Sequence, residues 1–322
     1  MSQEHLAIVS PSPHLRSRNT TQRIMLDACL ALVPALAASV WHFGPRALLV
    51  TIISVGSCVI FEALFRIITK RARTIHDLSA VVTGMLLAFN LPATLPFWMI
   101  PIGAFVAIVV VKELFGGIGK NFANPAITAR IVLMLGFALP MTSWNAPHAN
   151  SWDAVATATP MNILNGGEGT LPTLLQMFLG QRAGSLGETC ALALLLGFAY
   201  LCLRRVITPI VPFCFVGTVA LWSFIYAGFD ITFMGYQVLG GGLLLGAIFM
   251  ATDYSTSPIS TKGKIVFAVG CGLLTCLIRF YSNMPEGVSF AILIMNLLTP
   301  HIEKLTAPKI FGSGKEKKHE KA

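Results

Sequence analysis

About ten apolar runs, separated mainly by glycine, proline and charged clusters, fill most of this 322-residue chain. One bilayer crossing takes roughly 20 apolar residues, so some runs can span a membrane fully and others are shorter than a crossing. Only 11% of the residues are charged, against about 25% in soluble proteins. The sequence therefore predicts an all-α integral membrane protein with about ten transmembrane helices. The runs lie at 24–41, 47–68, 79–91, 97–111, 125–140, 189–203, 206–227, 237–252, 264–281 and 287–299.

Several other classes of protein are disfavoured by what the runs contain. The first 22 residues are polar and lack the features of a cleaved signal peptide, so the first run is expected to stay in the protein. All seven cysteines lie inside apolar runs without a CxxC pair, which indicates small core residues rather than disulfides or an iron–sulfur motif. The histidines lie near run ends or in connections, which disfavours intramembrane haem, and no metal site is predicted. GGIGKN at 116–121 lacks the spacing and the preceding strand of a nucleotide phosphate loop.

Lysine and arginine gather in every second connection between the runs. By the positive-inside rule this places both termini in the cytoplasm and the long 141–188 connection outside. The net charge of +9 is thereby explained without a nucleic-acid partner, and the basic tail is expected near anionic lipid headgroups. The predicted organisation is a cytoplasmic N-terminus (1–23), a first membrane half (24–140), an outer loop (141–188), a second membrane half (189–299) and a basic cytoplasmic tail (300–322).

The two membrane halves share a weak internal similarity. VVTGMLLAFNLPATLP at 81–96 resembles VLGGGLLLGAIFMATDYSTSP at 238–258, and each is followed by an ordinary run and then a polar start to the last run of its half. Because each half holds an odd number of runs, a repeat between them is inverted. Paired segments broken by glycine or proline are typical of discontinuous helices that meet at a central site. Chance similarity between Leu/Gly-rich segments is the alternative.

Polar residues near these segments are candidates for a ligand site or an ion path, because broken helices expose backbone groups that lipid cannot satisfy. Asp253 and Glu286 are ionisable, which marks a functional candidate at membrane depth, although each is also compatible with a helix end facing water. Lys120 is compatible with an anion cradle or with ordinary cytoplasmic positive charge. The full set comprises Lys120, Asn121, Asn124, Asp253, Glu286 and Asn296.

The segment DAVATATP at 153–160 lies in the longest polar connection. Pro160 disfavours helix at Thr159 and keeps the chain extended there. Small neighbours such as Ala158 leave the Thr159 hydroxyl approachable, and Asp153 offers a carboxylate for recognition. From spacing alone, a plain Thr/Ala loop explains the segment better than a modification site does.

Three segments together change that interpretation: KNFANPAITAR at 120–130, DAVATATP at 153–160 and MPEGVSFAILIMN at 284–296. With the order of the runs, they resemble a family of membrane proteins over essentially the whole chain. This family includes the D subunit of the Rnf complex, an ion-translocating ferredoxin:NAD oxidoreductase, and the B subunit of the sodium-pumping NADH:quinone reductase.

The resemblance implies FMN joined through a phosphoester to Thr159 by a separate flavin transferase on the outer side. The family motif is close to D-x-x-S-G-A-T-P. Here Asp153, Ala158, Thr159 and Pro160 match it, whereas Ala156 and Thr157 replace its serine and glycine, which puts recognition by the transferase in question.

The resemblance further implies a urea-transporter-like fold of two inverted five-helix halves and a second, non-covalent flavin, riboflavin or FMN, in the membrane body. It implies a place in the bacterial inner membrane beside iron–sulfur and flavin subunits, which would bind ferredoxin and NAD. Such a chain is one part of a translocase, without a complete active site of its own. The alternative from a different class is a channel or secondary transporter on the same inverted repeat, without a redox role.

Overall fold

The computed structural model describes residues 20–71, 75–147, 157–282 and 287–307. The regular secondary structure of these residues is helical, and each predicted apolar run contains a helix. The elements are α1 (Thr21–Phe43), α2 (Pro45–Ile68), the 3₁₀ turn η1 (Ile75–Asp77), α3 (Ser79–Phe89), α4 (Met99–Phe105), the π-helix η2 (Val106–Glu113), α5 (Pro125–Gly136), α6 (Ala138–Thr142), α7 (Pro160–Leu164), α8 (Leu174–Leu179), α9 (Ala191–Leu203), α10 (Ile210–Tyr226), α11 (Ile231–Leu239), α12 (Leu243–Leu245), the π-helix η3 (Gly246–Met250), α13 (Thr261–Tyr281) and α14 (Val288–Thr306).

Among the described residues, four helices are long and apolar enough to cross a membrane: α1, α2, α13 and α14. Helix α11 and the α12–η3 segment, bent by 60° at their junction, make a fifth when counted as one broken span. Helices α3, α5, α9 and α10 are apolar but shorter. The predicted all-α fold is confirmed and fits an integral membrane protein, while the two inverted five-helix halves stay a prediction.

Helix boundaries follow local sequence signals. Thr20 caps α1 by accepting a backbone hydrogen bond, and α1 ends at Gly44, whose φ of +72° is readily adopted only by glycine. Pro45 then begins α2, where a missing N–H costs nothing. Asn124 caps α5 in the same way, with Pro125 in the first helical position.

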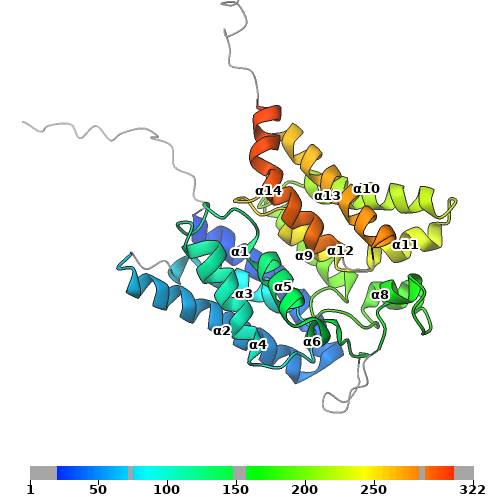
Figure 1. The fold of residues 1–322 in the computed structure, drawn as a ribbon, viewed down its shortest axis with the longest axis horizontal. Helices are drawn as coiled ribbons and strands as arrows, with labels where there is room; N and C mark the ends of the chain where they lie inside the picture. Colours follow the sequence, from blue (N-terminus) through cyan, green and yellow to red (C-terminus); the bar gives the residue numbers. More distant parts are fainter. Residues whose placement is uncertain (1–19, 72–74, 148–156, 283–286, 308–322) are drawn as a thin grey trace, which may run out of the picture.

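Small residues let neighbouring helices approach closely. A Cβ added to Gly84 of α3 would lie 2.6 Å from the Val55 Cα of α2, and Gly197 of α9 faces the Ala31 carbonyl of α1. Lipid supplies no hydrophobic driving force between helices, so such close packing is a main source of their association. In Figure 1, α2 to α5 lie on one side of the body and α10 to α14 on the other, and the α1–α9 and α5–α14 contacts join them.

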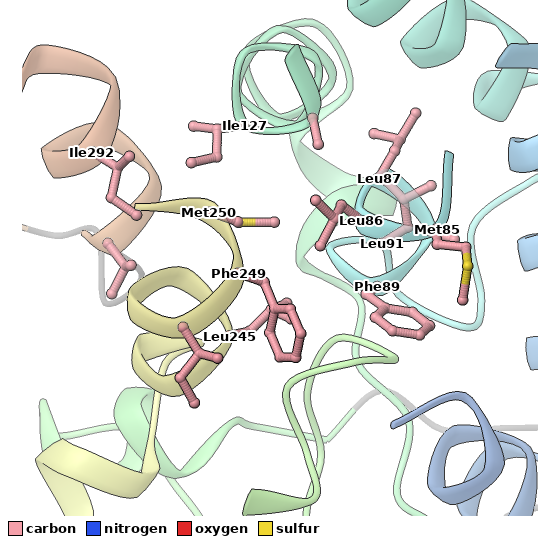
Figure 2. Packing of buried hydrophobic residues seen from close by; sticks show 14 of the residues in the cluster. Met85, Leu86, Leu87, Phe89, Leu91, Ile127, Leu245, Phe249, Met250 and Ile292 are labelled. Carbon is pink, nitrogen blue, oxygen red and sulfur yellow. The ribbon is translucent and has the colours of Figure 1, made fainter. Parts of the chain in front are cut away.

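The short helix α3 meets the broken α11–α12–η3 segment inside the body. Helix α3 has 11 residues, and at 1.5 Å each it covers about 16 Å, roughly half of a hydrocarbon core. Figure 2 shows Leu86 and Phe89 of α3 opposite Phe249 and Met250 of η3. Leu86 and Phe249 also line the smaller of two cavities that form the candidate site.

Candidate functional site

Two adjoining cavities open where α1 begins and α14 ends. Their volumes are about 120 and 550 Å³, and the larger lies within the roughly 300–1,000 Å³ range typical of ligand sites. Asn121 and Asp253 line both cavities, while Thr21 and Glu303 line only the larger. In Figure 1, α14 ends at the top of the body and α6 lies near its lower edge.

The smaller cavity lies at the N-terminus of α5. Asn124 lines it and donates through Nδ2 to the Met250 carbonyl at 3.2 Å, so the start of α5 is tied to the end of η3. Asn121 Oδ1 is buried and has no hydrogen-bond partner among the residues that the structure describes. A bound molecule with an N–H or O–H group would satisfy this oxygen, because buried acceptors without partners are costly.

Asn296 of α14 continues this polar wall into the larger cavity. With its amide oriented to suit its neighbours, it donates to the Thr256 carbonyl at 3.2 Å and accepts from the Asn124 backbone N–H at 3.1 Å. The Asp253 carboxylate accepts hydrogen bonds from Ser255 Oγ at 3.0 Å and Thr256 Oγ1 at 3.3 Å. Asp253 therefore stabilises the turn after η3 and also presents a carboxylate at the cavity wall.

The structure thus brings together four of the residues predicted from the sequence: Asn121, Asn124, Asp253 and Asn296. Lys120 is exposed and is not among the residues lining either cavity. Glu286 and Asp153 lie outside the described residues.

A buried charge pair forms part of the smaller cavity. Lys112 lines it, and its Nζ lies 2.7 Å from Glu62 Oε2 and 2.6 Å from Ser79 Oγ. Next to this pair, the Arg66 guanidinium lies 3.0 Å from the Glu113 carboxylate. From the sequence, Lys112 counts among the lysines and arginines of the connections that the positive-inside rule places in the cytoplasm. Lys112 directly follows one apolar run and Glu62 lies inside another, and these positions indicate that the two charges can be buried as a pair.

Thr159 caps the short helix α7 and is 6% exposed, whereas Thr157 is exposed. Its Oγ1 accepts from the Asn162 N–H at 3.3 Å. Met161 packs against the junction between α11 and α12, because a Cβ added to Gly240 would meet its Sδ at 2.7 Å. The predicted attachment segment therefore ends against the broken helix. Ala158 and Pro160 flank Thr159 as expected from the sequence.

A buried arginine holds the carbonyls that this break leaves without helical partners. Arg279 of α13 is 1% exposed, and its Nη1 donates to the Gln237 carbonyl at 2.6 Å. Its Nη2 donates to the Gly240 carbonyl at 3.0 Å and the Gly241 carbonyl at 3.3 Å. Sequence reasoning missed this residue, although an arginine inside the apolar run 264–281 was a visible signal.

A second polar centre lies between the end of α3 and η3. Arg130 of α5 donates to Asn90 Oδ1, directly after α3, at 2.9 Å. The Asn90 Nδ2 group donates back to the Leu86 carbonyl and contacts the Met250 sulfur at 3.7 Å. Residues 182–189, placed in the predicted outer loop, are all buried beside this centre. Their only sequence signal was the short GSLGET stretch before α9.

The chain is similar to known proteins over nearly its full length. Residues 8–312 match the model of the NQR2, RnfD, RnfE family. The chain is 44% identical to the D subunit of the Na⁺-translocating ferredoxin:NAD⁺ oxidoreductase complex of Acetobacterium woodii, covering 98% of each chain. It is 40% identical to the D subunit of the proton-translocating ferredoxin:NAD⁺ oxidoreductase complex of Clostridium ljungdahlii, covering 96% of this chain and 97% of that one. The D subunit of an ion-translocating oxidoreductase complex of Escherichia coli is 31% identical over 95% of this chain and 99% of its own.

Proposed function

The chain belongs to the NQR2, RnfD, RnfE family, and we propose that it is the flavin-carrying membrane subunit of an ion-translocating ferredoxin:NAD oxidoreductase complex. The observation that carries this proposal is the match to the D subunits of such complexes from end to end. That match favours a member of a complex over an independent channel or secondary transporter. Other subunits of the complex, including iron–sulfur and flavin subunits, would bind ferredoxin and NAD.

The first part of the proposal is that Thr159 carries FMN through a phosphoester. Esterification replaces the hydroxyl hydrogen and leaves an oxygen lone pair, so Oγ1 can still accept from the Asn162 N–H. The side chain is 6% exposed, however, and α7 packs against α11. We therefore expect the flavin transferase to act before α7 packs against α11.

The second part is that the adjoining cavities hold a non-covalent flavin, riboflavin or FMN. Asn121, Asn124, Thr83 and Asp253 offer amide, hydroxyl and carboxylate groups to the polar edge of such a ring. The Asn121 Oδ1 atom, buried without a partner in the described part of the chain, suits the ring N–H. A flavin bound there would accept and release electrons, while this wall would orient it and limit water.

The ion path is the third part. Asp253 lies at the cavity wall, and with Glu286 it is proposed to take part in ion movement. We place the protein in the bacterial inner membrane as two inverted five-helix halves, with both termini and the cavities on the cytoplasmic side. The connection that carries Thr159 would then face outward, while its last residues, 182–188, are buried in the helical body.

Fluorescence of the denatured polypeptide in a gel tests the covalent flavin, because only an attached flavin survives denaturation. Thr159→Ala should abolish the fluorescent band, and Thr157→Ala should retain it. Thr159→Ala also removes a helix cap, so Thr173→Ala is the matched control: it removes the cap of α8 and should keep the fluorescence. A fluorescent Thr159→Ala band would overturn the assignment.

The cavity flavin needs a separate measurement. Asn121→Leu should lower the amount of flavin released by acid from the purified complex, while the fluorescent covalent band stays unchanged. Exposed Lys120→Leu, at the neighbouring position, is the control and should release the wild-type amount. Equal release from all three proteins would contradict a flavin in these cavities.

A further inference from the structure

The segment 182–189, which precedes α9, lies inside the helical body. Its eight residues are all buried. Leu186 and Gly187 donate backbone hydrogen bonds to the Leu91 and Phe89 carbonyls at 3.1 and 3.0 Å, where α3 has just ended. Arg182 donates to the Glu188 and Thr189 carbonyls at 2.6 and 3.2 Å. The backbone of this segment is therefore fixed against the end of the short helix α3.

The side chains of this segment hold oxygen atoms whose hydrogen-bonding capacity is unused. Glu188 is 5% exposed, and its Oε2 atom has no hydrogen-bond partner within residues 20–71, 75–147, 157–282 and 287–307. The same holds for the hydroxyl oxygens of Ser185 and Thr189, which are fully buried. Three buried side-chain oxygens within five residues thus have no hydrogen-bond partner in the described part of the chain.

Two glycines pack directly against the Glu188 carboxylate. A Cβ at Gly184 would lie 2.8 Å from Oε1, and a Cβ at Gly242 would lie 2.7 Å from Oε2. Gly242 has a φ of +67° and ends the break between α11 and α12. The carboxylate therefore sits directly beside the broken helix, where only a residue without a side chain fits.

A carboxylate at this depth requires a cation, a proton or hydrogen bonds to offset the loss of water. Oxygen atoms from carboxylates and hydroxyls are the ligands that hard cations prefer. We propose that Glu188, with Ser185 and Thr189, binds the translocated cation, an alkali cation or a proton, at the α11–α12 break. This inference rests on the proposed function in an ion-translocating complex.

Arg130 lies close enough to Glu188 to promote release of the ion from such a site. A Cβ added to Gly242 would lie 3.9 Å from Arg130 Nη1 and 2.7 Å from Glu188 Oε2, so the two side chains lie near the same point. The hydrogen bond that Nη1 donates goes to Asn90 Oδ1. A guanidinium this close weakens cation binding by charge repulsion and can replace the cation on the carboxylate. Transport requires binding that is weak enough for the ion to leave.

The test uses the whole complex in proteoliposomes and measures ²²Na⁺ uptake and lumenal pH per electron transferred. Glu188→Gln should lower the ratio for the translocated ion at least about tenfold, because it removes a charged ligand. The ²²Na⁺ and pH signals distinguish the two cations. Glu168→Gln is the matched control: this carboxylate is exposed and follows α7 in the sequence, so the variant should keep the wild-type ratio.

An assembled Glu188→Gln complex with a wild-type ratio for both ions would overturn the site. If this variant does not assemble, Glu188→Asp decides: an assembled complex with a changed cation concentration for half-maximal uptake supports the site, and an unchanged one rejects it. Failure of both variants to assemble would show a structural carboxylate and also reject it. If the wild-type complex itself moves no ion, the proposed function fails instead.

Discussion

The Lys112 ammonium lies 2.7 Å from the Glu62 carboxylate, and both side chains are buried. Removing one partner of a buried ion pair typically costs about 3–5 kcal/mol, whereas replacing both with apolar groups is often neutral. Lys112→Met should therefore lower the free energy of unfolding by about this amount, and Lys112→Met with Glu62→Met should recover most of it.

Thermal unfolding of the detergent-solubilised protein measures this double-mutant cycle. The pair between Arg204 and Asp27 supplies the control, because the Arg204 side chain is half-exposed. Arg204→Met should change the stability much less, because exposed ion pairs contribute little. A Lys112→Met variant as stable as Arg204→Met would contradict the importance of the buried pair.

Arg279→Met should destabilise the protein more than any surface arginine variant. It leaves the Gln237, Gly240 and Gly241 carbonyls without these hydrogen bonds at the helix break, each at a cost of about 1–3 kcal/mol. The measurement is the melting temperature in detergent, with exposed Arg205→Met as the control. Equal melting temperatures for the Arg279→Met and Arg205→Met variants would show that the Arg279 hydrogen bonds do not stabilise the helix break.

Two glycines in neighbouring helices should respond in opposite directions to alanine. Gly197→Ala pushes a methyl group into the Ala31 carbonyl of α1 and should destabilise the α1–α9 contact by about 1–3 kcal/mol. Gly217 of α10 has no atom within 4 Å of its Cβ position, so Gly217→Ala should be neutral or stabilising by up to about 1 kcal/mol. Unfolding curves of both variants test this; a Gly197→Ala variant as stable as the wild-type protein would refute the close α1–α9 approach.

Asp253→Asn should preserve assembly and FMN attachment but lower ion uptake per electron. Asparagine retains an oxygen that can accept from Ser255 and Thr256, so the turn survives while the charge at the cavity wall is lost. Loss of a charged ligand lowers the affinity for the ion by about tenfold or more. Proteoliposomes containing the assembled complex provide the ratio, and Ser255→Ala controls for the turn. An unchanged ratio would leave Asp253 with a structural role only.

The sidedness of the protein can be read from single cysteines introduced after the seven native cysteines are replaced. Glu168→Cys lies near α7, and Ile259→Cys lies beside the larger cavity; both positions are exposed. A membrane-impermeant maleimide should label Glu168→Cys in intact cells and Ile259→Cys only after lysis. The reverse pattern would invert the topology inferred from the lysine and arginine distribution.

The sequence by itself determined the helices and the family. Apolar run length, capping residues such as Asn124 and breakers such as Pro45 act over a few neighbouring positions, so the helices were predictable from them. Asn121, Asn124 and Asp253 could be predicted because each lies next to one end of an apolar run, and Asn296 because it is a polar residue inside such a run. The match to the family likewise needed only the linear motifs.

Only the tertiary structure decided which polar groups meet inside the body. Lys112 and Glu62 are 50 positions apart, and Arg130 and Asn90 are 40 apart. Neither partner could be chosen from local pattern, because an ion pair depends on which helix faces are packed together. Glu188 is the clearest case: its segment looks like part of a polar outer loop, and it becomes a buried carboxylate only because 182–189 bonds to the end of α3 and lies beside Gly242. Backbone groups released by interrupted helices must find partners away from water, and that requirement draws a polar segment into the interior.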